Sequence, residues 1–177
     1  MELGPRHLPS LRIGMMRRMY GALVLLSVFS LGGCATLARA DDFSRYCNGR
    51  FGFCVDYPTG LVLEPEPDNG DGRRFHDSAG FLMMASAMTN ASDDTLEREM
   101  NSQAGGFDRI TYQAKGKDWF VLSGSKGSHI LYRKTYIGPG AVNRLYFEYP
   151  ATLNKKYNPI VTKISRSFEP GDLVHGR

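Results

Sequence analysis

The sequence predicts an α+β domain, in which a mostly antiparallel sheet with a meander in its C-terminal half is covered by two helices. Short apolar runs separated by Gly-rich turns fill the second half of the chain, and two stretches carry helix signals. The composition is that of an ordinary globular protein, with 42% hydrophobic and 23% charged residues. The 177 residues leave room for one such domain and a leader.

The first part of the domain reads as strands joined by a polar loop. Residues 51–57 alternate large with small or polar side chains and stop at Pro58, which predicts a strand followed by a turn. Residues 64–72 are dense in Pro, Gly, Asp and Asn, which predicts a loop. Residues 81–88 form a short apolar run that fits a buried strand, and the methionines in this run fit a helix equally well.

Two helices are expected. Ser92 is a suitable cap for the first, two acidic residues follow it, and the helix should run to about Ser102 before residues 104–106 end it. For the second helix we expect Asn158 as the cap and Pro159 at the first helical position. Its apolar face would consist of Tyr157, Ile160, Val161, Ile164 and Phe168.

The C-terminal half predicts an antiparallel meander. Gly-rich connections at residues 124–127 and 138–140 separate β-rich runs, and short connections of this kind join antiparallel neighbours. The expected strands cover residues 110–114, 118–122, 129–137 and 142–149.

Three of these segments resemble the PsbP/Mog1-like fold. They are residues 46–58, in which a strand ends in Val-Asp-Tyr-Pro, the strand at residues 119–124, and the last helix at residues 160–168. The chain is also similar to uncharacterised secreted proteins of proteobacteria with an Asn-Gly-Asp-Gly loop before an apolar strand. The resemblance covers about residues 43–170. It implies a binding or assembly protein more than an enzyme, and it transfers no catalytic residue.

The N-terminus has the order of a secretory signal peptide. The pair Arg17-Arg18 precedes an apolar stretch at residues 23–31, and small residues and Cys34 follow. The apolar stretch is shorter than the roughly 20 residues of a membrane span. We therefore expect an exported bacterial envelope protein, with a single α+β domain at residues 41–177.

Two cleavage positions fit this leader. Residues 31–34 (Leu-Gly-Gly-Cys) resemble a lipoprotein signal, so that residues 1–34 would form the leader and Cys34 would carry the lipid. Ordinary cleavage after Ala40 would make the leader residues 1–40 instead. The position of Cys34 directly after the apolar stretch favours the lipoprotein. By resemblance to bacterial lipoprotein sorting, Ala35 then favours a periplasm-facing protein anchored to the outer membrane.

The two remaining cysteines predict a disulfide. Cys47 and Cys54 form an even pair that closes a short loop, and nearby thiols tend to pair in an oxidising compartment. A redox or metal site is the alternative, but the spacing is not C-x-x-C and no His lies near it in sequence. A further alternative is that both cysteines are free and buried.

Net charge argues against nucleic acid as a partner. The formal charge is +4, but without residues 1–34 the chain has 18 basic and 17 acidic residues, and a phosphate-binding protein needs a basic excess. The charges are unevenly distributed along the chain. Residues 41–108 carry 13 acidic and 5 basic residues, whereas residues 109–177 carry 4 acidic and 12 basic ones. Internal pairing is the default interpretation, and docking of a charged partner is the functional one.

No catalytic or metal-binding constellation emerges from the residues. His76 and His129 lack a recognisable partner for acid–base work. Ser123 and Lys126 match S-x-x-K, but the companion motifs are absent and a hairpin turn is expected there. Residues 68–72 lack the spacing of a calcium loop. We predict no catalytic residue, metal or cofactor.

These observations favour a non-enzymatic envelope protein that binds a protein partner, and an immunity protein against a delivered toxin is a specific version. The membrane would be contacted through the lipid on Cys34. The alternative is a carrier or sensor of a small apolar ligand, with Met83, Met84 and Met88 lining a pocket between sheet and helices. A hydrolase with a scattered site ranks third. The sequence does not indicate which residues contact the partner.

Overall fold

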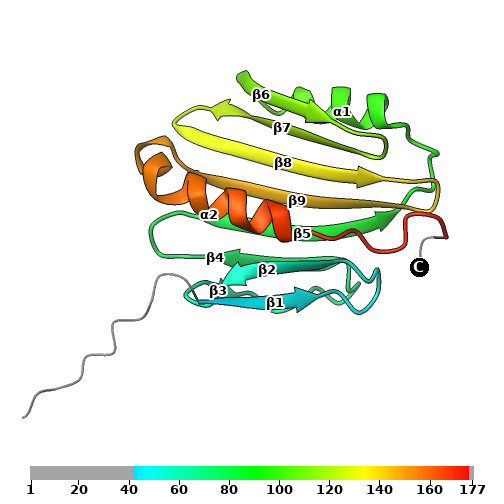
Figure 1. The fold of residues 1–177 in the computed structure, drawn as a ribbon, viewed down its shortest axis with the longest axis horizontal. Coiled ribbons are helices and arrows are strands. Elements are labelled where there is room, and N and C mark those ends of the chain that lie inside the picture. Colours follow the sequence, from blue (N-terminus) through cyan, green and yellow to red (C-terminus); the bar gives the residue numbers. More distant parts are fainter. Residues whose placement is uncertain (1–41, 176–177) are drawn as a thin grey trace, which may run out of the picture. The chain divides into compact units, whose positions relative to one another are not determined.

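The computed structural model describes residues 42–175, in which seven strands form one antiparallel sheet and two N-terminal strands pair in a separate ribbon (Figure 1). The ribbon consists of β1 (Phe43–Cys47) and β2 (Cys54–Pro58). The strands of the large sheet are β3 (Val62–Leu63), β4 (Gly72–His76), β5 (Leu82–Thr89), β6 (Arg109–Lys115), β7 (Trp119–Lys126), β8 (His129–Ile137) and β9 (Ala141–Pro150).

The order of strands in the large sheet is β3-β4-β5-β9-β8-β7-β6. Strands β6 to β9 are consecutive antiparallel neighbours, so the predicted C-terminal meander is confirmed. Strand β5 pairs with β9 over its whole length and joins the first half of the chain to the second. With two helices packed on this sheet, the predicted α+β class is confirmed.

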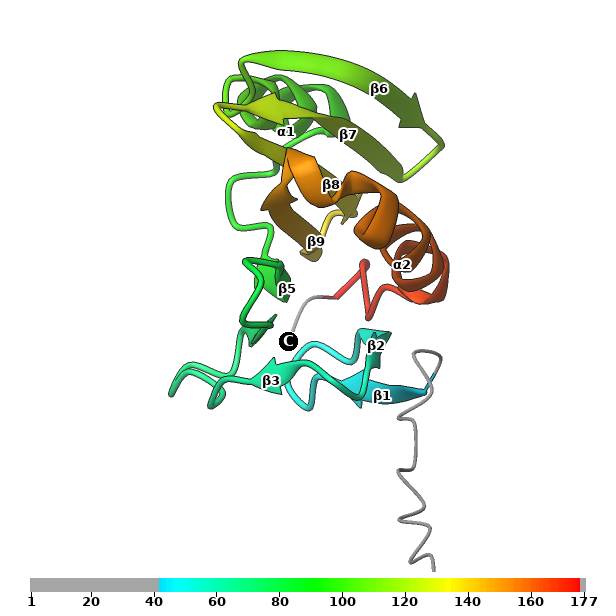
Figure 2. The same ribbon diagram turned by 90° about the vertical axis from the view of Figure 1, so that its left-hand side faces the viewer.

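The two helices lie on opposite faces of the sheet. Helix α1 (Leu96–Ala104) lies beside β7, whereas α2 (Asn154–Ser167) contacts β9 and β2 (Figures 1 and 2). Successive side chains of a strand point to opposite faces, and in β9 Arg144 meets α1 while Leu145 enters the core under α2. Each helix covers part of one face, and each leaves the rest of that face uncovered.

An aromatic core lies between α2, the β1–β2 ribbon and the sheet. Rings from both ends of the chain contact each other there, with centroids 4.7 Å apart for Phe81 and Tyr157 and 6.0 Å apart for Phe53 and Phe168. The ribbon closes the core over β4 through Tyr46, whose ring centroid lies 5.7 Å from that of Phe75. Every one of these side chains except Tyr46 is at most 2% exposed, so their burial supplies much of the driving force for folding.

The N-terminal strands differ from the prediction. The strand expected at residues 51–57 begins only at Cys54, because the Asn48 side chain accepts hydrogen bonds from two backbone amides of the preceding turn and Gly52 has a φ of 74°. Strands β1, β3 and β4 were not predicted. Charged and polar residues interrupt the apolar alternation of β1 and β4, and β3 has only two residues.

Both helices begin elsewhere than predicted. Thr95, and not Ser92, caps α1 by accepting a hydrogen bond from the Arg98 amide at 3.3 Å. Helix α2 begins at Asn154, so that Pro159 lies inside the helix. Proline there removes one backbone hydrogen bond close to the helix start, and the burial of the apolar face outweighs this loss. Of the predicted face, Tyr157, Val161 and Ile164 are buried in α2, Ile160 is half-buried, and Phe168 is buried just beyond the helix.

Candidate binding surface

The face of the sheet that carries α1 is uncovered over β4, β5 and β9. Arg74, Met84, Tyr146 and Arg133 form a row of directly paired residues across four strands, so their side chains share this face. Met88 lies further along β5 and is 45% exposed. We call this area the open face and define it by Arg74, Met84, Ser86, Met88, Arg133, Arg144, Tyr146 and Glu148.

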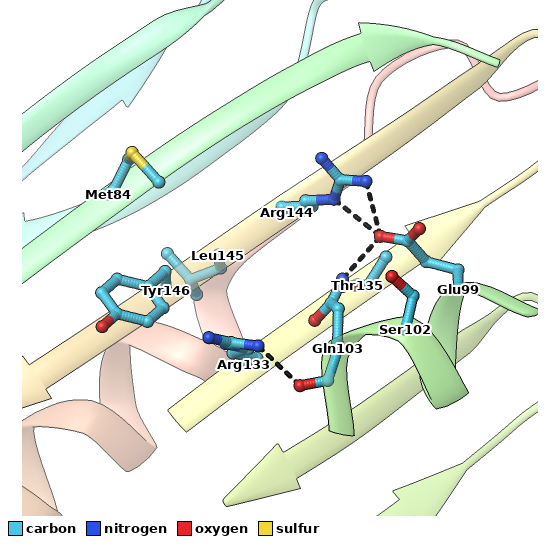
Figure 3. A pocket seen from close by; sticks show the side chains of 9 residues that line it. All are labelled: Met84, Glu99, Ser102, Gln103, Arg133, Thr135, Arg144, Leu145 and Tyr146. Atoms are coloured by element: carbon cyan, nitrogen blue, oxygen red, sulfur yellow. Dashed lines mark hydrogen bonds and ion pairs between the residues drawn. The ribbon is translucent and has the colours of Figure 1, made fainter. Parts of the chain in front are cut away.

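Two hollows adjoin on the open face. The first, of about 390 Å³, lies between α1 and the sheet, with Met84, Arg133 and Tyr146 among its lining residues (Figure 3). The second, of about 290 Å³, lies beneath the loop at residues 64–71, and Met84 lines it too. Met84 lines both hollows, so they lie next to each other on this face, and we refer to the two hollows together as the trough.

A buried carboxylate fixes α1 to the sheet beside the trough. The Glu99 side chain is 8% exposed, and its Oε1 accepts hydrogen bonds from Nε and Nη2 of Arg144 at 2.8 and 2.5 Å. Gln103 Nε2 donates to the same oxygen at 2.7 Å and also reaches the Thr135 hydroxyl at 2.9 Å (Figure 3). A buried charge requires such partners. The charge of Arg144 is therefore already engaged within the protein.

Arg133 is held flat at the edge of the trough. Its Nη1 donates to the Gln103 carbonyl at 2.7 Å, and its Cζ lies 5.0 Å from the ring centroid of Phe107 and 5.6 Å from that of Tyr146. A Cβ on residue 106 would lie 2.6 Å from Nη2, so Gly106 permits this close approach. Within residues 42–175 no carboxylate oxygen lies within 4.0 Å of the Arg133 guanidinium.

Tyr146 presents a neutral hydroxyl to the open face. The hydroxyl donates to Glu148 Oε2 at 2.5 Å. Burial, followed by the hydrogen bond to the Glu148 carboxylate and its charge, raises the pKa of Tyr146 far above its ordinary value. The phenol is therefore protonated at physiological pH and cannot act as a base there.

The uneven charge distribution along the chain does not divide the sheet. Strands β3, β4 and β5 come from the acidic half, but their charged side chains of fixed sign are Arg73 and Arg74 of β4, and none of these strands contains an acidic residue. The acidic residues of this half that the structure describes lie in β2, in α1 and in loops, and α1 lies over strands of the basic half. Ion pairs join the halves within the described part of the chain: Arg45–Glu169, Lys115–Glu97, Arg144–Glu99 and Lys156–Asp77. These ion pairs support the interpretation that the charges of the two halves pair within the protein.

The structure does not assemble the residues that were considered for catalysis. His76 in β4 and His129 in β8 are separated by two strands, and neither has a carboxylate within 4.0 Å among residues 42–175. Ser123 and Lys126 lie in β7 and not in the predicted turn. At a spacing of three in a strand, their side chains point to opposite faces. Lys126 therefore cannot activate Ser123.

The predicted loop at residues 64–72 contains a tight turn, in which the Gly70 amide donates to the Pro67 carbonyl at 2.8 Å. Gly70 has a φ of 64°, and Arg50 donates to the Asn69 carbonyl at 2.5 Å and to Asp71 Oδ1 at 2.7 Å. Across the described residues, no group of three or more His, Cys, Asp or Glu side chains is placed to hold a metal ion. In the same part of the chain, no helix combines the length and the apolar character needed to cross a membrane.

Cys47 and Cys54 form the predicted disulfide. Their Cα atoms lie 4.1 Å apart as a directly paired position between β1 and β2. The bond closes the turn that carries Phe51 and Phe53, two side chains of the core. Cys34, the expected lipid attachment site, lies outside the described residues.

The three methionines proposed for an apolar pocket do not lie together. Met83 is fully buried in the core under α2, whereas Met84 and Met88 belong to the open face. As successive residues of β5, Met83 and Met84 point to opposite faces of the sheet. The expected pocket between sheet and helices is replaced by the open trough.

Sequence reasoning missed Glu99, Arg133 and Arg144. One signal was present, because Leu96, Glu99, Met100 and Gln103 follow the spacing of one helix face and place Glu99 toward the sheet. The sequence held no comparable signal for Arg133, because its partners Phe107 and Tyr146 come from a loop and another strand.

Comparison with known proteins supports the fold. No protein-family model and no curated protein matches the sequence. The solution structure of cyanobacterial PsbP (CyanoP) from Synechocystis sp. PCC 6803 matches with a TM-score of 0.54 and 15% identity, covering 79% of this chain and 98% of that chain. A structure from Bacteroides thetaiotaomicron VPI-5482 matches with a TM-score of 0.45 and 15% identity, covering 72% and 48%. The first match shows that the domain has a PsbP-like fold, as the sequence predicted; the second is too remote to add to this.

Proposed function

We propose that this chain is a non-catalytic protein of the bacterial envelope that binds a protein partner through the open face. The observation that carries the proposal is the uncovered half of this face, where Met88 is 45% exposed and a trough crosses the strands. Ordered polar and apolar groups that alternate over several strands offer a protein both packing area and fixed hydrogen-bonding positions.

The binding test is a cross-linked pull-down of the tagged chain from intact envelopes of its native host, read by mass spectrometry. We expect one dominant protein partner that is lost with Met88→Arg, which places a cation on the open face beside Arg144. Tyr112→Arg is the matched control, because Tyr112 is 56% exposed on the opposite face. Equal capture by both variants would refute the open face as the binding surface, and capture of no partner by the wild-type chain would refute the proposed function.

Export and lipid anchoring complete the proposal. They rest on the leader sequence and on Cys34 directly after its apolar stretch. We expect labelled palmitate to be incorporated into the wild-type chain and not into Cys34→Ser. Acylation would keep the domain at the membrane, because each buried methylene contributes about 0.8 kcal/mol. Release of an unlabelled chain that starts at Asp41 would instead establish ordinary cleavage after Ala40.

An immunity protein is the specific version that we propose. A small periplasmic lipoprotein is suited to block a toxin that a neighbouring cell delivers into the envelope. Deletion of the gene should then sensitise the host to co-cultured siblings, and the captured partner should be a toxin. A deletion strain that grows normally among toxin-delivering siblings would exclude this version while leaving partner binding intact.

Binding of a small apolar ligand is the second candidate. The volume of the first hollow, about 390 Å³, lies in the range of small-molecule sites. Native mass spectrometry of the purified chain would reveal a retained ligand as a defined mass increment. Loss of that increment in Met84→Lys, but not in Tyr112→Lys, would place the ligand in the trough.

A further inference from the structure

The arginines Arg74, Arg133 and Arg144 beside the trough differ in whether a carboxylate of the protein lies close to the guanidinium. Arg144 donates twice to Glu99, and Arg74 Nε lies 3.8 Å from Glu64 Oε1. Arg133 has no carboxylate within 4.0 Å in the described chain, and a single backbone carbonyl is its recorded hydrogen-bond acceptor. One fixed positive charge in the trough is thus left without a counter-charge.

We propose that Arg133 anchors a site for a carboxylate of the protein partner, carried beside an apolar group that packs on Met84 and Tyr146. This inference rests on the proposed partner binding and adds its chemistry. A guanidinium presents several parallel N–H groups, which match the two oxygens of a carboxylate.

The surroundings of Arg133 are prepared for such a ligand. The rings of Phe107 and Tyr146 and the Gln103 carbonyl hold the guanidinium in place, so little side-chain freedom is lost on binding. The nearby carboxylates do not compete for it: Glu99 is engaged by Arg144, and Glu148 accepts from the Tyr146 hydroxyl. Met84, paired directly with Tyr146, supplies an adaptable apolar floor.

A pair of small probes tests the chemistry directly. N-acetyl-L-phenylalanine carries a carboxylate beside an apolar ring, whereas its primary amide has the same shape without the charge. We would titrate each into the purified chain labelled at the methionine methyl groups and follow the Met84 and Met88 signals by NMR. The acid should shift the Met84 signal with saturation, and the amide should bind at least about tenfold more weakly.

Variants of Arg133 show whether this residue carries the effect. Arg133→Gln should weaken the acid about tenfold or more, and Arg133→Lys should restore only part of the affinity because it lacks the planar fork. Arg166→Gln is the matched control. Arg166 is exposed on α2, so this substitution removes the same charge on the other face of the sheet. Equal binding of acid and amide, or unchanged binding by Arg133→Gln, would overturn the proposal.

Two glycine variants test the position of the Arg133 guanidinium without replacing Arg133, in case Arg133→Gln fails to fold. Gly106→Ala displaces the guanidinium without removing it, while Gly105→Ala meets only an ordinary contact at 3.7 Å. The first should weaken binding of the acid and the second should not. Equal affinity in both would overturn the proposal.

The pull-down separates this inference from the proposed function. If the wild-type chain captures a partner and Arg133→Gln does not, the result supports both the carboxylate site and partner binding. Undiminished capture by Arg133→Gln would overturn the carboxylate site while partner binding stands, and if the acid probe still required Arg133, the site would serve a free organic acid instead. Capture of nothing by the wild-type chain would refute partner binding itself and, with it, a carboxylate supplied by a partner.

Discussion

The sheet has two uncovered areas, one on each face, and they differ in chemistry. The open face beside α1 carries charged side chains of both signs around its trough, among them Arg74, Arg133, Arg144, Glu64, Glu99 and Glu148. The area beside α2, which we call the hydroxyl face, has a hollow of about 380 Å³ without a charged lining residue. Its lining residues are Thr111, Ser123, Gly124, Ser125, Ile130, Tyr132, Tyr149, Asn158, Val161 and Thr162.

Both areas come from the same strands, so the fold alone does not explain the difference. In β8, Tyr132 points to the hydroxyl face and its neighbour Arg133 to the open face. The PsbP-like fold provides two places without a helix, and the sequence puts fixed charges at one of them. Fixed charges steer encounter and orientation, which neutral hydroxyls do weakly.

Loss of the disulfide should loosen the β1–β2 ribbon and expose the part of the core that it covers. The β1–β2 ribbon closes the core over β4, and the Cys47–Cys54 bond limits the freedom of this ribbon in the unfolded chain. Replacing both cysteines by serine should lower the free energy of unfolding by about 2–3 kcal/mol in urea denaturation. Dithiothreitol should destabilise the wild-type chain and leave the double variant unchanged. An unaltered wild-type midpoint after complete reduction would contradict this.

Glu99→Ala should loosen α1 from the open face. The variant leaves Arg144 half-buried without its carboxylate and removes the acceptor of Gln103, which should cost about 1–2 kcal/mol. Glu97 on the same helix is the control, because its side chain is 69% exposed and its ion pair with Lys115 is 3.7 Å long. Glu97→Ala should cost less than about 0.5 kcal/mol. Similar decreases in the free energy of unfolding for the two variants would mean that Glu99 does not attach α1 to the sheet.

Gly106→Ala should disturb the open face alone. The added methyl group meets the Arg133 guanidinium, so we expect a loss of about 1 kcal/mol. Gly105→Ala should change the free energy of unfolding by no more than about 0.5 kcal/mol. Chemical shifts at Met84 should move in the first variant, and those of the hydroxyl face should stay in place. Shifts spread evenly over both faces would contradict a local effect.

Tyr149 on the hydroxyl face should make the stability of the domain depend on pH only under alkaline conditions. Burial raises the pKa of Tyr149 to about 12, whereas an unfolded tyrosine titrates near about 10. Because the folded pKa is the higher one, the stabilisation is complete below about pH 10 and disappears as the pH rises toward about 12. Unfolding measured between pH 8 and 12 should show this decline, reduced in Tyr149→Phe. If the free energy of unfolding of Tyr149→Phe declined with pH as much as that of the wild-type chain, other tyrosines would be the cause of the decline.

The sequence predicted most strands of the sheet but not its surface. The meander was predictable because apolar runs and Gly-rich turns are local signals. For residues 81–88 the sequence left strand and helix open, and the structure shows the strand β5. The starts of α1 and α2 were misplaced, since Ser92 and Asn158 are good caps in isolation. In the structure Thr95 caps α1, and α2 begins at Asn154 without a side-chain cap.

The trough was out of reach for a more general reason. Its residues come from α1, β4, β5, β8 and β9, and only the register of those strands brings Arg133, Tyr146 and Met84 into one row. The disulfide was predictable because two nearby cysteines need no tertiary information. Charge counts along the chain pointed to a division, but they could not show that the acidic α1 lies over basic strands.

We expect the partner to contact the open face and not the hydroxyl face. The most direct test places a benzophenone amino acid at Met88 or at Tyr112, both exposed and on opposite faces. Irradiation of intact envelopes should yield one strong cross-linked product from position 88 and little from position 112. A product from position 112 alone, or equal products from both positions, would contradict the account.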